Sequence, residues 1–175
     1  MNTLIRISCL ALLLGVSSAA VADKSAGTHV DDGWLHTKVK STLTFHGGTN
    51  INIEVYHGVV QLAGFVDTES REQKILEAAG EIEGVVDVDD QIYVVEKDRM
   101  AGEALDDASI ATKVKAAFSD NKLVDGFDVN VESNRGVVLL SGFVDSKDNA
   151  AAAIETAQGV EGVTRVIDGT ALKPN

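Results

Sequence analysis

An internal duplication is the feature that most constrains this chain. Residues 58–67 read Gly-Val-Val-Gln-Leu-Ala-Gly-Phe-Val-Asp, and residues 136–145 match them at 8 of 10 positions, at an offset of 78. The same offset aligns Glu-Gly-Val at 83–85 with Glu-Gly-Val at 161–163. A repeat at a fixed period indicates one structural unit used twice. Whatever one copy folds into, the other must fold into as well.

The two copies differ in the length of one connection. Thr-Lys-Val-Lys at residues 37–40 matches residues 112–115 at an offset of 75, so the second copy carries three extra residues near 121–127. Insertions are tolerated in surface loops. We therefore expect a loop there, between a first helix and a first strand.

Each copy begins with a predicted amphipathic helix. In the first copy, from Trp34 to about Phe45, apolar residues recur at helical spacing at Leu35, Val39 and Leu43. The corresponding apolar positions of the second copy are Ile110, Val114, Ala117 and Phe118. Acidic residues stand where the N-caps of the four predicted helices would lie: Asp32, Asp67, Asp107 and Asp145.

Two strands and a second helix follow. Alternating apolar residues predict the first strand, at Ile51, Ile53 and Val55 and at Val129 and Val131. A tight turn at Gly58 or Gly136 leads to a return strand, with one face toward the helices: Val60, Leu62 and Gly64, or Val138, Leu140 and Gly142. An apolar stripe predicts the second helix, at Ile75, Leu76, Ala79 and Ile82, or Ala153, Ile154, Ala157 and Val160. Gly84 or Gly162 is expected to end that helix, and a last strand begins at Val85 or Val163.

The predicted fold is therefore α+β, with two tandem αββαβ modules. Each module is a three-stranded mixed sheet with two helices on one face, which leaves the other face of the sheet uncovered. On that face Asn52, Glu54 and Gln61 are expected to be solvated. The apolar residues there are expected either to pack between the modules or to bind a partner: Val59, Ala63, Val137 and Leu139. Leu139 is the most informative, because its counterpart is Gln61.

The first 22 residues have the pattern of a secretory signal peptide. A basic residue, Arg6, precedes an apolar run from Ile7 to Val16, and Ala-Val-Ala at 20–22 is typical of a cleavage site. The run is too short for a membrane span. The single cysteine, Cys9, falls inside this segment, and Arg6 lies where a lipoprotein signal would carry an apolar residue. We expect a periplasmic protein, cleaved after Ala22, without a lipid anchor or a transmembrane segment.

The negative net charge disfavours polyanionic partners. Fifteen basic and 27 acidic residues give a net charge of −12, and loss of Arg6 with the signal gives 14 − 27 = −13. Such a charge opposes non-specific binding to nucleic acid or to an anionic lipid surface, and it favours solubility. A local basic patch remains compatible with it.

The paired motifs resemble the BON domain. They are Gly-Val-Val-x-Leu-x-Gly-Phe-Val-Asp, a helix and Glu-Gly-Val-x-x-Val, and the resemblance divides the chain into residues 30–96, a linker at 97–106, and residues 107–173. It implies a periplasmic or outer-membrane-associated protein linked to envelope integrity under osmotic stress, with phospholipid binding or chaperone-like activity and no catalysis. It also assigns a structural role to the repeated glycines, Gly58, Gly64, Gly84, Gly136, Gly142 and Gly162.

No catalytic, cofactor or metal site is expected from the residues themselves. The four histidines lack a helical ligand spacing and have no histidine counterparts in the second copy: His29, His36, His46 and His57. The acidic run Asp87-Val88-Asp89-Asp90 lacks the glycine-punctuated loop of a calcium-binding EF-hand, and is expected to be a solvated strand edge. No serine or cysteine lies in a nucleophile motif.

Two functional hypotheses follow. The first is a non-enzymatic periplasmic stress protein that binds unfolded or exported proteins or envelope surfaces weakly, through Val59, Val137 and Leu139. The second is a peripheral module that binds anionic phospholipid through residues of the first helices: Trp34, Lys38, Lys40, Lys113 and Lys115. Tryptophan and lysine suit a membrane–water boundary. Alternatively, Trp34 packs against its own module and the lysines are merely solvated.

The signal pattern yields the first testable prediction. The exported protein should begin at Asp23 and be recovered in the soluble periplasmic fraction, because the cleavage motif ends at Ala22. Intact-mass measurement checks this. A retained signal, or a lipid adduct on Cys9, would contradict it.

Overall fold

A computed structural model describes residues 31–48, 50–95, 101–121, 124 and 129–173. The predicted signal segment and His29 lie outside the described residues. The first module contains α1 (Asp32–Phe45), β1 (Ile51–Tyr56), β2 (Val59–Val66), α2 (Glu69–Gly80) and β3 (Asp87–Val94). The second contains α3 (Ala101–Asp120), β4 (Asn130–Asn134), β5 (Val137–Val144), α4 (Lys147–Gln158) and β6 (Arg165–Leu172). The predicted order of helix, strand, strand, helix and strand is confirmed in both.

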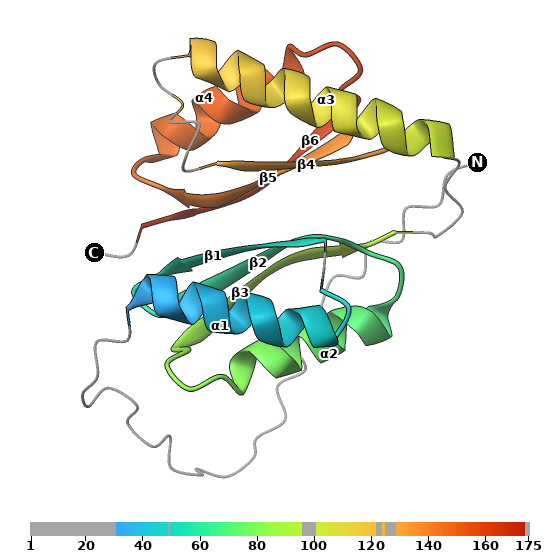
Figure 1. The fold of residues 1–175 in the computed structure, drawn as a ribbon. Helices are drawn as coiled ribbons and strands as arrows, with labels where there is room; N and C mark the ends of the chain where they lie inside the picture. Colours follow the sequence, from blue (N-terminus) through green and yellow to red (C-terminus); the bar gives the residue numbers. More distant parts are fainter. Residues whose placement is uncertain (1–30, 49, 96–100, 122–123, 125–128, 174–175) are drawn as a thin grey trace, which may run out of the picture.

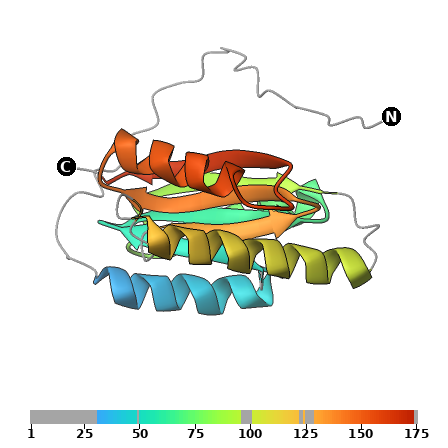
Figure 2. The ribbon, with the colours of Figure 1, turned by 90° about the horizontal axis from the view of Figure 1, so that it is seen from above.

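Each module is a mixed three-stranded sheet covered by two helices on one face. β1 pairs antiparallel with β2, and β2 pairs parallel with β3; β4, β5 and β6 repeat this arrangement. The two uncovered sheet faces lie against each other, so the molecule has four layers, helices–sheet–sheet–helices (Figure 1). Seen from above, the strands of the two sheets lie over one another between the helix layers (Figure 2).

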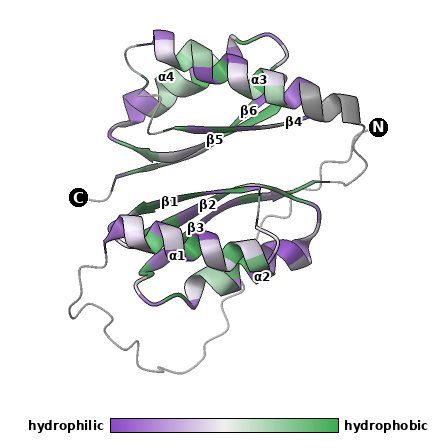
Figure 3. Ribbon diagram, viewed as in Figure 1, coloured by the Kyte–Doolittle hydropathy of each residue, from purple (hydrophilic) through white to green (hydrophobic). Residues whose placement is uncertain are grey.

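Each module has its own hydrophobic core between helices and sheet. In the first, Leu35, Val39 and Leu43 of α1 are fully buried against Val60 and Leu62 of β2. The second core is built from the predicted counterparts, among them Val114, Phe118, Val138, Leu140, Ala153 and Ala157. Along α1 and α4, hydrophobic and hydrophilic residues alternate (Figure 3), as expected for helices with one buried side.

None of the four predicted N-cap residues caps its helix. Asp31 caps α1, Thr68 caps α2 and Ser146 caps α4, while Asp67 and Asp145 form ion pairs with Arg71 and Lys173. Asp32 is the first residue of α1, and Asp107 lies inside α3, which starts at Ala101. Residues 101–106 of the predicted linker are helical, and 97–100 lie outside the described residues.

Asp32 and Asp107 instead hold the hairpin turns. Asp32 accepts hydrogen bonds from the backbone N–H groups of His57 (2.8 Å) and Gly58 (3.0 Å). Asp107 accepts from the corresponding groups of Arg135 (2.9 Å) and Gly136 (3.0 Å). In both modules a hydrogen-bonded carboxylate on the first helix ties that helix to the turn.

These hydrogen bonds stabilise an unfavourable backbone conformation, because both central residues of each turn have positive φ. His57 and Gly58 have φ of 50° and 80°, and Arg135 and Gly136 have φ of 52° and 75°. This is the backbone of a type I′ hairpin turn. A non-glycine residue is uncommon in that region, and the two aspartate hydrogen bonds offset its cost.

Of the other repeated glycines, Gly84 and Gly162 lie in the turns that follow the second helix of each module. α2 ends at Gly80 and α4 at Gln158, so Gly84 and Gly162 lie beyond the helices and do not end them. Their φ of 99° and 97° shapes the turns that lead into β3 and β6. The extra residues of the second copy fall between α3 and β4, where 122–123 and 125–128 lie outside the described residues.

The outer strands β3 and β6 each contain the same kind of local hydrogen bond. Asp90 accepts from the backbone N–H of Ile92, two residues on (2.9 Å). In β6 the equivalent Asp168 accepts from the N–H of Thr170 (3.0 Å) and also from its hydroxyl. Because each strand lies at a sheet edge, these bonds occupy a backbone donor that the ladder does not use.

Gly64 provides a stability prediction with a matched control. It has a φ of 154°, and an added Cβ would lie 2.8 Å from the carbonyl oxygen of Asn50 and 3.0 Å from Ile51 Cδ1. The clash is thus with β1 and the residue before it, whereas the sequence placed Gly64 on the strand face toward the helices. We expect Gly64→Val to lower the free energy of unfolding by about 1–3 kcal/mol.

Urea unfolding measures this effect. Gly80→Ala is the control, since nothing lies within 4 Å of its added Cβ; it should be neutral or stabilising by up to about 1 kcal/mol. Equal unfolding midpoints for the two variants would contradict the predicted clash at Gly64.

Candidate functional site

The outward face of α1 carries two exposed aromatic residues with a lysine between them. Trp34 is 51% exposed and Phe45 is 89% exposed, and Lys38 places its Nζ 4.6 Å from the centroid of the Trp34 ring. Residues 34, 38, 41 and 45 follow helical spacing and lie on one side of the helix. We call Trp34, Lys38, Ser41 and Phe45 the α1 stripe.

The stripe faces outward because the opposite side of α1 belongs to the core. Leu35, Val39 and Leu43 are fully buried there. Trp34 is not part of that core, and about half of its surface is exposed. Lys40 is exposed as well, but it lies about 200° around the helix from Lys38, at about 100° per residue. Sequence analysis missed Phe45, which at the helix end looked like a boundary residue.

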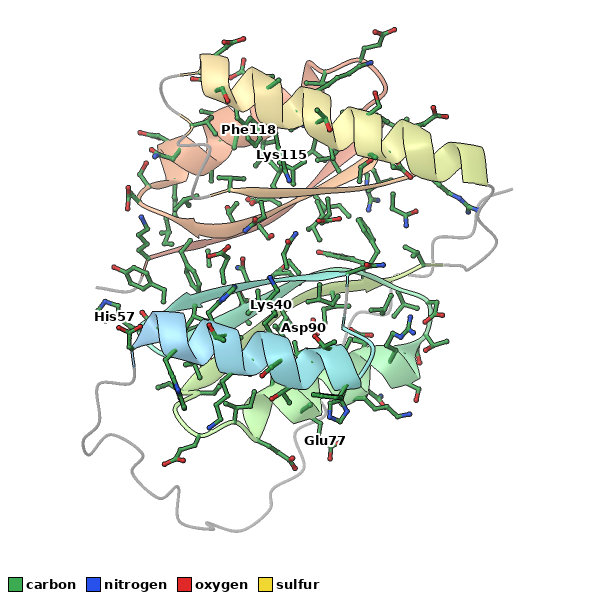
Figure 4. The ribbon with its side chains drawn as sticks, viewed as in Figure 1. Lys40, His57, Glu77, Asp90, Lys115 and Phe118 are labelled. Atoms are coloured by element: carbon green, nitrogen blue, oxygen red, sulfur yellow. The ribbon has the colours of Figure 1, made fainter. Side chains whose placement is uncertain are left out.

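The second module has lysines without aromatic neighbours. At the positions of Trp34 and Phe45 it has Ser109 and Asp120. Lys113 and Lys115 are exposed on α3, and Lys113 Nζ lies 3.9 Å from a carboxylate oxygen of Glu161. Figure 4 marks Lys40 on α1 and Lys115 on α3, which belong to the two outer helix layers on opposite sides of the sheet pair. The predicted lysines do not form one patch.

The predicted partner face lies between the modules. Leu139 is 1% exposed, and Val59 and Val137 are half-buried. Gln61, expected to be solvated, is also 1% exposed. That expectation was wrong because the second module covers the sheet face on which Gln61 lies. In this arrangement a partner would have to separate the modules to reach Leu139.

Gln61 is hydrogen-bonded both within its own sheet and across this interface. Its Nε2 donates to Asp89 Oδ2 (2.7 Å) and to the carbonyl oxygen of Gly169 (3.0 Å), and its Oε1 accepts from the N–H of Gly142 (2.5 Å). Asp89 also accepts from Gln91 Nε2 (3.0 Å). Burying a polar side chain is costly unless its groups are paired, and here they are.

Two equivalent hydrogen bonds flank the interface on the β1 and β4 side. Asn52 Nδ2 donates to Glu132 Oε1 (3.0 Å), and Asn130 Nδ2 donates to Glu54 Oε1 (2.8 Å). The offset of 78 converts either bond into the other. The modules are thus related by an approximate two-fold axis, as in an isologous dimer. Tyr56 and Phe143 also meet across the interface, with ring centroids 5.6 Å apart.

Next to Tyr56 and Phe143 is a shallow cleft of about 270 Å³. Its other lining residues are Glu54, Val55 and Lys173. Lys173 Nζ lies 2.8 Å from Asp145, and Glu54 is bonded to Asn130. The charged side chains of this cleft therefore already pair with residues of the protein.

The acidic run of β3 is used within the protein. Asp87 and Asp90 accept from nearby backbone N–H groups on the same strand, and Asp89 bonds to Gln61 and Gln91. His57 stacks on Tyr56, with ring centroids 4.5 Å apart. Among the described residues there is no cluster of three or more histidine, cysteine or acidic side chains that could hold a metal ion.

Glu72 on α2 and Asp90 on β3 form a pair of interacting carboxyl groups. Desolvation raises the pKa of Glu72, and the neighbouring charges of Asp90 and Glu69 raise it further. Desolvation also raises the pKa of Asp90, against the lowering effect of its bond from Ile92. The folded protein therefore binds protons at this pair more readily than the unfolded chain does.

Comparison with known proteins shows the family. The BON domain model matches residues 31–96 and again residues 106–174. Osmotically-inducible protein Y of Escherichia coli is 33% identical over 145 residues, covering 80% of this chain and 72% of that protein. The 21 kDa hemolysin of Actinobacillus pleuropneumoniae is 33% identical over 157 residues, covering 87% and 80%. Outer membrane lipoprotein DolP of Haemophilus influenzae is 29% identical over 167 residues, covering 91% and 86%.

The carboxyl pair yields a pH prediction. A raised pKa in the folded state adds stability that is complete below the unfolded pKa of about 4 and is lost as pH rises through the folded pKa. Glu72→Gln removes the charge that opposes folding at neutral pH. We expect it to raise the unfolding midpoint at pH 7 and to flatten the change in midpoint between pH 7 and pH 5.

Glu77→Gln removes the same charge from an exposed site on the same helix and is the control. Thermal unfolding across this pH range measures both. Indistinguishable pH profiles for the two variants would show that the pair is not coupled to folding.

Proposed function

We propose that this chain, which belongs to the BON-domain family, is a non-enzymatic envelope protein whose first module binds phospholipid surfaces reversibly through the α1 stripe. The observation that supports this most directly is the exposure of Trp34 and Phe45 on one side of the helix, with Lys38 between them. Aromatic rings favour the membrane–water boundary, and lysine favours anionic headgroups.

The expected affinity is low. Complete burial of one large apolar side chain contributes about 1.5–3 kcal/mol, and a lysine near an anionic surface contributes about 1 kcal/mol. The net charge of −12 acts against these terms at a negatively charged bilayer. Binding should therefore be peripheral, and among the described residues no helix is long and apolar enough to span a membrane.

The relatives support a location in the envelope. One is named for its osmotic induction and another as an outer membrane lipoprotein. With the signal-like pattern of residues 1–22, these names favour a periplasmic location for this chain too. Unlike a lipoprotein, it would rely on the stripe alone for membrane contact.

Chaperone-like protein binding becomes the second proposal. It relied on the sheet face that contains Leu139, and that side chain is now 1% exposed beneath the other module. A client protein would have to displace the first module before reaching it. The stripe needs no such rearrangement.

Vesicle flotation with single-residue variants tests the lipid proposal. Lys38→Glu should reduce binding to anionic vesicles strongly, whereas Lys40→Glu, the same charge change on another side of α1, should reduce it less. Binding should also fall as salt rises, since exposed charges are screened beyond about 10 Å at 0.1 M. Trp34→Ala with Phe45→Ala should reduce binding to neutral vesicles as well, because it removes apolar contact.

Trp34 also reports on the contact directly. It is the only tryptophan of the chain, so its fluorescence should shift to shorter wavelength when vesicles bind. An unchanged spectrum, or equal losses for Lys38→Glu and Lys40→Glu, would refute the stripe. Suppression of client aggregation that responds to Leu139→Asn but not to the stripe variants would favour the second proposal.

A further inference from the structure

The two inner sheet faces are alike on their first strands and different on the other two. On β1 and β4, Asn52 and Glu54 of the first module correspond to Asn130 and Glu132 of the second. On the middle and last strands the corresponding residues differ in size or polarity, namely Gln61 with Leu139, and Gln91 with Gly169. The bonds between β1 and β4 are therefore available to any pair of modules, whereas the contacts of the other strands are not.

Two first modules would collide at Gln91 of β3. In the structure Gly169 faces Gln91, and an added Cβ at Gly169 would lie 3.1 Å from Gln91 Oε1. In a pair of first modules, a second Gln91 would take the place of Gly169. Its longer side chain would occupy the space that the first Gln91 fills.

Two second modules would leave polar groups unpaired. Leu139 would then replace Gln61, which supplies the partner for the N–H of Gly142 and the carbonyl oxygen of Gly169. Leaving a buried polar group without a partner is unfavourable, because the group has lost its bonds to water. Such a pair would also lack Gln91 and leave the space beside Gly169 unfilled.

We infer that the inner face of the first module is a docking surface for the second module of any copy of this chain: Gln91 makes it reject another first module, and Gln61 supplies the bonds that a pair of second modules would lack. The partner is a second copy of the chain. When the modules of two copies separate, the first module of each fits the second module of the other, in a reciprocally exchanged dimer. This inference does not depend on lipid binding.

Crosslinking between full-length chains tests the selection. All chains carry Cys9→Ser, which removes the only native thiol. Asn52→Cys is mixed either with Glu132→Cys, its partner position in the unlike pair, or with Glu54→Cys, the equivalent position in a like pair. The mixtures are unfolded together in urea, refolded at high protein concentration, and treated with a short bifunctional maleimide.

Mass spectrometry of the linked peptides gives the yields. We expect links between residues 52 and 132 of different chains, at least about tenfold more abundant than links between 52 and 54, since a difference of about 1.4 kcal/mol is tenfold. Equal yields would overturn the selection, and no link in either mixture would overturn the exchange. Circular dichroism verifies that each chain refolds.

A further pair of substitutions tests the residues named. Gln61→Leu with Gln91→Gly gives the first inner face the residues of the second, and should lower the yield of links between 52 and 132 severalfold. Asn121→Ala, on the helix side of the second module where Asn121 bonds to Thr156, is the control and should leave that yield unchanged. If both variants crosslink like the parent chain, Gln61 and Gln91 do not determine pairing.

Discussion

The packing of the two sheets against each other determines which surfaces this protein presents. Each module buries one sheet face under its own helices, and the other face contains residues that water would not favour, such as Leu139 and Phe143. Closing the two faces together removes these side chains from water. What remains outside is two helix layers, four sheet edges and the hairpin turns.

This closure also explains why a polar side chain lies at the centre of the molecule. A purely apolar contact between two near-identical sheets would not distinguish one register from another. Gln61 specifies a single arrangement, because its amide reaches Asp89 in its own module and Gly142 and Gly169 in the other. Polar groups that must be satisfied restrict the geometry of an interface more than apolar side chains do.

The sequence alone predicted those features of the fold that depend on residues close together in the chain. Helix and strand periodicity reports burial against a local core, so the element order, the turns at Gly58 and Gly136, and the two cores followed from the repeat. The roles of Asp32, Asp107 and Gln61 did not, because their partners lie 25 to 108 residues away along the chain. Of the candidate site, Trp34 and Lys38 stood out by residue type. The helix was predicted to reach about Phe45, but the exposure of that side chain came only from the structure.

The bonds that Asp90 and Asp168 accept in the outer strands bear on how this protein behaves when crowded. A sheet edge with free backbone donors is a template on which another chain can extend the sheet, and repetition of that step produces fibres. In β3 and β6 one donor of each edge is already engaged by a carboxylate, which also brings negative charge to the strand that an incoming chain would approach. Both copies of the module retain this arrangement, so growth of the sheets is opposed at the same place in each, the β3 edge of one and the β6 edge of the other.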